Sequence, residues 1–223
     1  MSLLVLDSPY RDRQSMPFRF RQKRFAHVAR LIDEILEEKG SCRILDVGGE
    51  AVYWQIAEDF IAERNVEITL LNLSLEHAPG PNFIAMRGDA TKLDHLADNA
   101  FDLVHSNSVI EHVGSWQAME AMANQVRRLA PRYYVQTPNF WFPIEPHMRA
   151  PLFHWLPEQL RYRILMNFDI GFAPRRHTVE HAMRDVQSIA LLDRRQFAAL
   201  FPDAAMETER VLGLPKSLMA IRG

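Results

Sequence analysis

Two groups of residues in this sequence have the types and spacing to do chemistry. In the first, Asp46 and the glycine pair Gly48 and Gly49 end a short apolar run. Small residues let a backbone approach a ligand closely, and a following helix offers free N–H groups, so this turn is typical of nucleotide sites. The second group, Glu145 and His147, lies among aromatic residues and prolines, where polar side chains need partners. The glycine pair alone also fits a simple tight turn, whereas Glu145 and His147 are candidates for ligand binding or catalysis.

The elements that must position these residues alternate along the chain. Helical spacing of apolar residues predicts a helix over 15–39, with Ser15 as its cap, and two more over 50–63 and 115–130. Short, near-continuous apolar runs predict strands, which we place at 43–46, 66–73, 83–86, 101–105 and 132–136. This alternation predicts an open parallel α/β sheet with ligands at the carboxyl ends of its strands.

Residues 138–192 interrupt the alternation. Prolines and aromatic residues are dense here, and two helices are expected near 157–167 and 178–191. The segment is too long and too apolar for a plain connection, which favours a lid or binding element. After it, Asp193 is expected to cap a short helix ending at Phe201, and 205–212 and 217–222 are expected to be the closing strands.

The features after the first turn fall in a recognisable order. Asn72 ends the second predicted strand, Gly88-Asp89-Ala90 follows the third, and Phe101-Asp-Leu-Val-His-Ser-Asn-Ser-Val-Ile-Glu-His-Val contains the fourth and its exit loop. With Ile44-Leu-Asp-Val-Gly-Gly, this order resembles the class I S-adenosylmethionine-dependent methyltransferases, in particular the methyltransferase type 11 group. The resemblance covers roughly residues 41–137.

The resemblance implies a Rossmann-like, seven-stranded, mostly parallel sheet flanked by helices, with an N-terminal helix and a helical and aromatic cap inserted after the fifth strand. We expect a single domain, with residues 1–40 as the N-terminal segment and 41–137 and 193–223 as the core. The length, apolar character and aromatic cluster of 138–192 lead us to expect that this insertion is a cap that closes over the cofactor. The resemblance also implies S-adenosyl-L-methionine as the cofactor. The residues expected to bind it are Asp46, Gly48, Gly49, Asn72, Leu73, Asp89, Ala90, Ser106 and Asn107.

The sequence departs from the family pattern at two places. Glu50 and Val52 stand where the family usually has further glycines, and Asn72 stands where it usually has an acidic residue for the ribose. The altered glycine loop favours one alternative, a non-catalytic module with this fold. A nucleic-acid methyltransferase is a second alternative, and a nicotinamide oxidoreductase fits the glycine pattern poorly.

The catalytic residues implied are His112, Glu111, His147 and Glu145. His112 is the candidate base for a hydroxyl or amine acceptor, and Glu111 is expected to orient its loop. The pair also looks like the Glu-x-x-Glu-His pattern of metal-assisted methyltransferases, with His147 as the extra ligand. Because Ser108 occupies the first glutamate position, one hard oxygen ligand is missing, and we expect no metal site.

Composition bounds the remaining possibilities. The 223 residues are 48% hydrophobic and 24% charged, the balance of a globular chain, and the net charge of −2 disfavours nucleic acid as the partner. The single cysteine, Cys42, and the lack of a long apolar run lead us to expect a cytoplasmic protein without integral membrane association. We expect a small-molecule or glycan or lipid precursor acceptor, methylated on oxygen or nitrogen. The sequence leaves the acceptor and the oligomeric state open.

Overall fold

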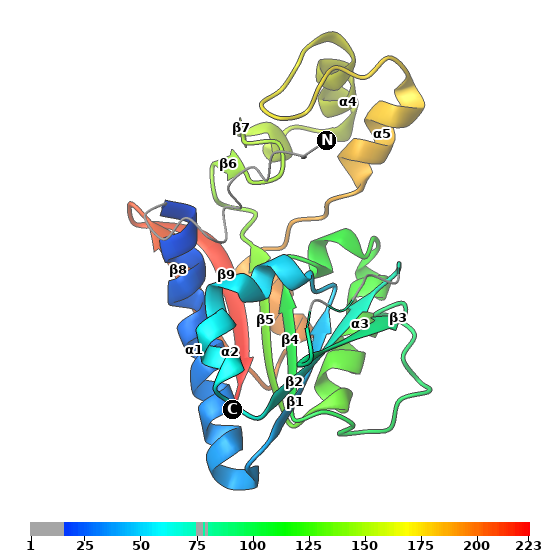
Figure 1. The fold of residues 1–223 in the computed structure, drawn as a ribbon. Helices are drawn as coiled ribbons and strands as arrows, with labels where there is room; N and C mark the ends of the chain where they lie inside the picture. The colour runs from blue at the N-terminus through cyan, green and yellow to red at the C-terminus, as the bar shows by residue number, and fades with distance from the viewer. Residues whose placement is uncertain (1–15, 75–77, 79) are drawn as a thin grey trace, which may run out of the picture. The chain divides into compact units, whose positions relative to one another are not determined.

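A seven-stranded sheet is the centre of the fold in the computed structural model, which describes residues 16–74, 78 and 80–223. Its strand order is β3-β2-β1-β4-β5-β9-β8, as Figure 1 shows. The strands are β1 Cys42–Val47, β2 Val66–Asn72, β3 Phe83–Arg87, β4 Leu103–Asn107, β5 Arg132–Pro138, β8 Ala205–Val211 and β9 Leu214–Arg222. This confirms the expected seven-stranded, mostly parallel sheet.

The first four strands bring their carboxyl ends to one edge. β1 pairs in parallel with β2 and with β4, and β2 pairs in parallel with β3. Asp46, near the end of β1, lies opposite Leu70 on one side and His105 on the other. β1 is buried at five of its six positions, which explains its near-continuous apolar sequence.

The last two strands form a hairpin closed by a two-residue turn. Leu212 and Gly213 both have positive φ, at 50° and 81°. Two successive residues of this kind make the turn that matches the twist of an antiparallel pair. β9 begins at Leu214, three residues before the predicted start, because the turn is this short.

The helices confirm the predicted positions with one exception. α1 spans Met16–Lys39 and α3 spans Trp116–Leu129, with Ser115 Oγ accepting from Ala118 N at its start; the predicted cap Ser15 lies outside the described residues. The prediction of one helix over 50–63 is wrong. The segment is a 3₁₀ helix, η1 (Ala51–Ala57), followed by a five-residue α-helix, α2 (Glu58–Ala62). Bulky and β-branched residues open it, and Trp54 is drawn to Asp46, so the tighter helix forms there.

The chain divides into two compact units, which we describe separately. The first contains the described residues up to Asn107 together with Asn124–Val135 and Ile221–Gly223; the second contains Ser108–Ala123 and Gln136–Ala220. In the first unit the apolar face of α1 is fully buried at Val28, Leu31 and Ile32. None of the described helices is long and apolar enough to cross a membrane.

The insertion after β5 has its own elements and core within the second unit. Its elements are β6 Ile144–Glu145, β7 Ala150–Pro151, the 3₁₀ helix η3 Phe153–Trp155, α4 Glu158–Asn167 and α5 Val179–Gln187. They pack around a cluster of buried residues: Met148, Ala150, Phe153, Leu165, Ala173, Ala182 and Val186. The two predicted helices are confirmed, although α5 ends at Gln187 rather than 191. The capping box at Asp193 begins α6 (Arg194–Leu200), as expected.

Candidate active site

The glycine turn after β1 depends on the absence of side chains. Gly48 has a φ of +68°, a conformation that favours glycine. A Cβ on Gly49 would lie 1.9 Å from Asp46 Oδ2. The positive φ therefore favours glycine at position 48, and the Asp46 carboxylate, which takes the space of the missing side chain, requires glycine at position 49. Gly48 is half-buried and Gly49 is buried.

Asp46 lies under this turn, and its carboxylate is fully engaged. Trp54 Nε1 donates to Oδ2 at 2.7 Å, and His105 Nδ1 contacts Oδ1 at 2.6 Å, with all three side chains buried. The His105 ring stacks on Tyr134, with 5.6 Å between centroids. Asp46 thus ties η1 and β4 to the turn, and its expected contact with the cofactor stays a prediction.

Asn72 and Asp89 stand at the carboxyl ends of β2 and β3. Asn72 Nδ2 donates to Gly49 O at 2.9 Å, so its amide braces the glycine turn while its carbonyl oxygen remains an acceptor. Asp89 Oδ1 accepts from Thr91 N and Thr91 Oγ1 at 2.9 and 2.7 Å. These hydrogen bonds, the backbone one first, hold the pKa of Asp89 below its ordinary value. The neighbouring Leu73 is exposed and Ala90 is half-buried.

The last residue of β4, Asn107, has a side-chain oxygen to which none of the described residues donates a hydrogen bond. Ser106 Oγ donates to Val47 O at 3.2 Å, which joins β4 to β1. Among the described residues, Asn107 Oδ1 is buried and has no hydrogen-bond partner. Both residues belong to the strand rather than to the loop after it, because β4 extends to Asn107.

This edge of the first unit fits a cofactor with ammonium, hydroxyl and amino groups. Asn107 Oδ1 and Asn72 Oδ1 can accept hydrogen bonds, and Asp89 adds an ionised carboxylate. The half-buried Gly48, which has no side chain, is the part of the turn that a ligand could approach closely. These features match the functional groups of S-adenosylmethionine.

In the second unit, Glu111 is a buried carboxyl group with one unused oxygen. Thr137 Oγ1 donates to its Oε2 at 3.0 Å, whereas Oε1 has no hydrogen-bond partner among the described residues. Burial raises the pKa of Glu111 to about 7, against the opposing effects of hydrogen bonds and of His147. Glu111 can therefore take up or release a proton near neutral pH.

His112 and His147 face each other beside this carboxyl group. Their Nε2 atoms are 3.1 Å apart; His112 Nδ1 contacts Ser188 O at 3.2 Å, and His147 Nδ1 contacts Glu145 Oε1 at 2.8 Å. A carbonyl or carboxylate oxygen only accepts, so each Nδ1 carries a proton and each neutral ring would present a lone pair at Nε2. Two lone pairs that face each other repel, so a cation must lie between the two Nε2 atoms. This cation is either a proton on one of the rings or a metal ion.

The surroundings of the two histidines differ in their charges. Desolvation, and then the neighbouring His147, lower the pKa of His112. His147 lies between Glu145 Oε1 at 2.8 Å and Glu111 Oε1 at 3.9 Å. One ligand atom from each of Glu111, His112 and His147 lies within 4.8 Å of the others, so these three are also the residues that could hold a metal ion.

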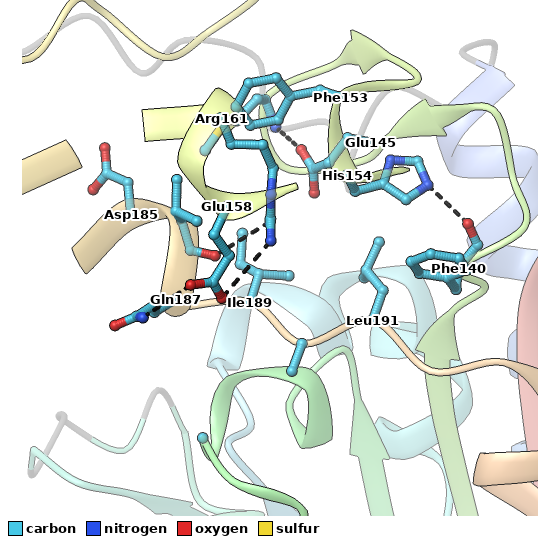
Figure 2. Close-up of a pocket in the computed structure, with 14 residues that line it drawn as sticks. Phe140, Glu145, Phe153, His154, Glu158, Arg161, Asp185, Gln187, Ile189 and Leu191 are labelled. Atoms are coloured by element: carbon cyan, nitrogen blue, oxygen red, sulfur yellow. Dashed lines mark hydrogen bonds and ion pairs between the residues drawn. The ribbon is translucent and has the colours of Figure 1, made fainter. Parts of the chain in front are cut away.

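A pocket of about 350 Å³ lies beside Glu145 in the second unit. Figure 2 shows Arg161 reaching into it from α4 and His154 at its other side. Its apolar wall includes Phe140, Phe153 and Val186. His154 is buried, and its Nε2 contacts Phe140 O at 2.8 Å.

The four predicted catalytic residues come together, although sequence reasoning missed several of their neighbours. It did not place Thr137 on Glu111 or Arg161 beside Glu145. Thr137 is fully buried at the end of β5. A buried polar residue at the carboxyl end of a predicted strand was the one signal that could have pointed to it.

Residues 45–133 match the model of a methyltransferase domain family. This match covers less than half of the chain, and over it the chain is similar to that family. This confirms the resemblance to the methyltransferase type 11 group and the assignment as an enzyme. The comparison with curated proteins found no match.

Several solved structures share the fold of this chain. The carbon methyltransferase CurJ matches with a TM-score of 0.54 and 11% identity over 96% of this chain and 56% of that one. An O-methyltransferase family protein from Burkholderia thailandensis matches with a TM-score of 0.51 and 11% identity over 94% and 61%. A protein from Rhodobacter sphaeroides described as a Zn-dependent alcohol dehydrogenase matches with a TM-score of 0.50 and 11% identity over 90% and 97%. At these identities the likeness shows the fold alone.

Proposed function

We propose that this protein transfers a methyl group from S-adenosylmethionine to an oxygen or nitrogen of a small molecule. The observation that carries the proposal is the glycine turn at the end of β1, within the segment that matches the methyltransferase family. Asn72, Asp89 and Asn107 provide acceptors at the same edge of the first unit. When bound, the cofactor supplies an electrophilic methyl group, and the protein positions and desolvates the partners.

The cluster in the second unit supports a role in binding the acceptor and removing its proton. Methyl transfer to a hydroxyl or a protonated amine requires that a proton leave the attacked atom. Every ring nitrogen of His112 and His147 already has a partner, whereas Glu111 Oε1 has none among the described residues. Glu111 is therefore the candidate for taking up the proton. Because its side chain is fully buried, the proton would reach it through His147, whose Nε2 is 3.9 Å from Oε1 and whose side chain is partly exposed; Thr137 is a positioning residue.

The insertion supports a role in acceptor choice. It has its own apolar core and contains the pocket beside Glu145. Its predicted closure over the cofactor, and the grouping of the whole chain as one domain, stay predictions.

A His147→Ala variant tests the role of the cluster. We expect turnover with labelled S-adenosylmethionine to fall by about a hundredfold or more, the usual range for lost acid–base catalysis, while affinity for S-adenosylhomocysteine stays within about twofold. His177→Ala, an exposed histidine of the same unit, is the matched control. Equal loss of turnover and cofactor affinity, or a collapse of the melting temperature, contradicts the assigned role.

One observation favours the alternative of a non-catalytic module. Both carboxylate oxygens of Asp46 and the amide nitrogen of Asn72 already bond within the protein. A module of this kind would bind neither S-adenosylmethionine nor S-adenosylhomocysteine in a calorimetric titration, whereas the proposed enzyme binds both.

A further inference from the structure

The pocket in the second unit contains three carboxylates that already have partners. Glu145 accepts from His147 and from Met148 N. Glu158 accepts from Gln187 Nε2 at 3.2 Å, and Asp185 pairs with Arg176. Glu145 and Asp185 are therefore paired with other residues of the insertion, whereas Glu158 has a neutral hydrogen-bond donor and lies 3.9 Å from Arg161.

Arg161 is the charged residue of this pocket that is poorly compensated. Its nearest carboxylate is Glu158, whose Oε1 is 3.9 Å from Nη2, and its Nη1 donates to Val186 O at a long 3.4 Å. Its Nε is buried without a hydrogen-bond partner among the described residues. The guanidinium group is largely buried, with its side chain 17% exposed, and burial lowers its pKa against the effects of Glu158 and Glu145. A buried N–H group without an acceptor is costly, and a guanidinium fork fits a carboxylate or phosphate in two parallel hydrogen bonds.

The rest of the pocket suits an apolar body. Figure 2 shows Phe153 beside the stem of Arg161, and Phe140, Ile189 and Leu191 also line the space that Arg161 enters. The volume of about 350 Å³ is within the range of small-ligand sites. Among the described residues, His154 Nδ1 is buried without a partner. Because His154 Nε2 must donate to Phe140 O, this Nδ1 is an acceptor that a ligand donor can use.

We propose that this pocket binds a small organic oxyanion, with its carboxylate or phosphate on Arg161 and its apolar body against Phe140 and Phe153. The binding of an oxyanion in this pocket does not depend on the proposed function. The use of that oxyanion as the methyl acceptor does rest on the proposed function. If both hold, the methyl acceptor is a small molecule that carries a carboxylate or phosphate group.

Four probes with the same ring and different head groups test the proposal on the full chain. Phenylacetate and phenyl phosphate carry the oxyanion, phenylacetamide is the neutral match, and phenethylamine carries the opposite charge. Dissociation constants from ligand-observed NMR are expected to be at least about tenfold lower for one of the two oxyanions than for the amide. The stronger of the two shows whether the head group is a carboxylate or a phosphate. The proposal is overturned if the amide and both oxyanions bind with equal affinity. It is also overturned if none of the probes binds.

Variants of two arginines on α4 locate the binding. Arg161→Gln is expected to abolish the preference for the oxyanion, and Arg161→Lys to reduce it because lysine lacks the planar fork. Arg163→Gln, an exposed neighbour on the same helix, is expected to leave it unchanged. If Arg161→Gln does not fold, Arg161→Lys decides, and an unaltered preference in the folded variant overturns the proposal. A parallel titration with S-adenosylhomocysteine keeps the two claims apart, because loss of cofactor binding contradicts the proposed function and leaves the pocket result standing.

Discussion

The buried surroundings of Glu111 disfavour the negatively charged form of its carboxyl group. Its side chain is fully buried and one oxygen has no hydrogen-bond partner among the described residues. An arrangement that raises the pKa of a carboxyl group to about 7 costs stability at neutral pH. A costly group beside two histidines is typical of a functional site rather than of a structural one.

Replacing Glu111 by glutamine is predicted to stabilise the protein and to lower its turnover. Because the native pKa is raised, the native state holds its proton while the unfolded state loses it as the pH rises from 4.5 to about 7. Wild-type stability therefore falls through this window, whereas that of Glu111→Gln does not. We expect the variant to be more stable by on the order of 1–3 kcal/mol at about pH 8 in urea unfolding, and equal to wild type below about pH 4.

Two results for the Glu111→Gln variant would contradict this prediction. A variant that is less stable than wild type at high pH would make Glu111 a structural residue. Unchanged turnover would remove it from the proton transfer.

Turnover is predicted to need no metal ion. One proton shared between His112 Nε2 and His147 Nε2 is sufficient to separate the facing lone pairs, and Ser108 Oγ donates to Gln136 instead of offering a carboxylate. Activity measured once an acceptor is known should survive EDTA. Loss on chelation with recovery on adding a divalent ion would instead make Glu111, His112 and His147 ligands.

The types of residue and their order along the chain predicted which residues lie in this site. They could not predict which side chains contact one another. Gly48, Gly49 and Asp89 follow strands closely in the sequence. The sequence therefore predicted that they lie at the carboxyl-end edge of the sheet. The engagement of Asp46 by Trp54 and His105 could not, because it depends on how η1 packs over β4.

Among the elements, the insertion depends on one close backbone contact. Gly171 has a φ of +54°, and a Cβ there would lie 1.8 Å from Met148 O. The neighbouring Phe172 N donates to the same oxygen at 2.9 Å. The segment after α4 can follow this path only with glycine at this position.

Gly171→Ala is therefore predicted to disorder the insertion. We expect a loss of stability of about 1–3 kcal/mol or more and loss of probe binding in the pocket, with S-adenosylhomocysteine binding retained. Gly80→Ala, where a Cβ meets nothing within 4 Å, is the control. Thermal melting and binding titrations check both variants, and normal probe binding by the Gly171→Ala variant would contradict the prediction.

The elements were predicted to within a few residues where apolar periodicity was strong. α1, α3 and the first five strands follow their sequence patterns because packing and propensity agree. The prediction failed over 50–63, where Asp46 draws Trp54 inward and a 3₁₀ helix replaces the first α-helical turns. The path of 138–192 could not be predicted because it depends on contacts such as Gly171 with Met148.

At the scale of the whole molecule, the fold does not determine the chemistry. Structures described as methyltransferases and as an alcohol dehydrogenase share it with this chain at 11% identity. The family match covers residues 45–133. Binding of the cofactor is therefore the claim on which the rest of the account depends.

Calorimetric titration of the full chain with S-adenosylhomocysteine tests this claim most directly. We predict saturable binding at one site per chain, weakened by roughly 1–3 kcal/mol in Asp89→Ala because a buried polar group of the ligand loses its partner. Thr91→Val keeps the Asp89 carboxylate while removing one of its hydrogen bonds, and is predicted to bind nearly as well as wild type. No measurable binding by the wild-type protein at millimolar ligand would contradict the account.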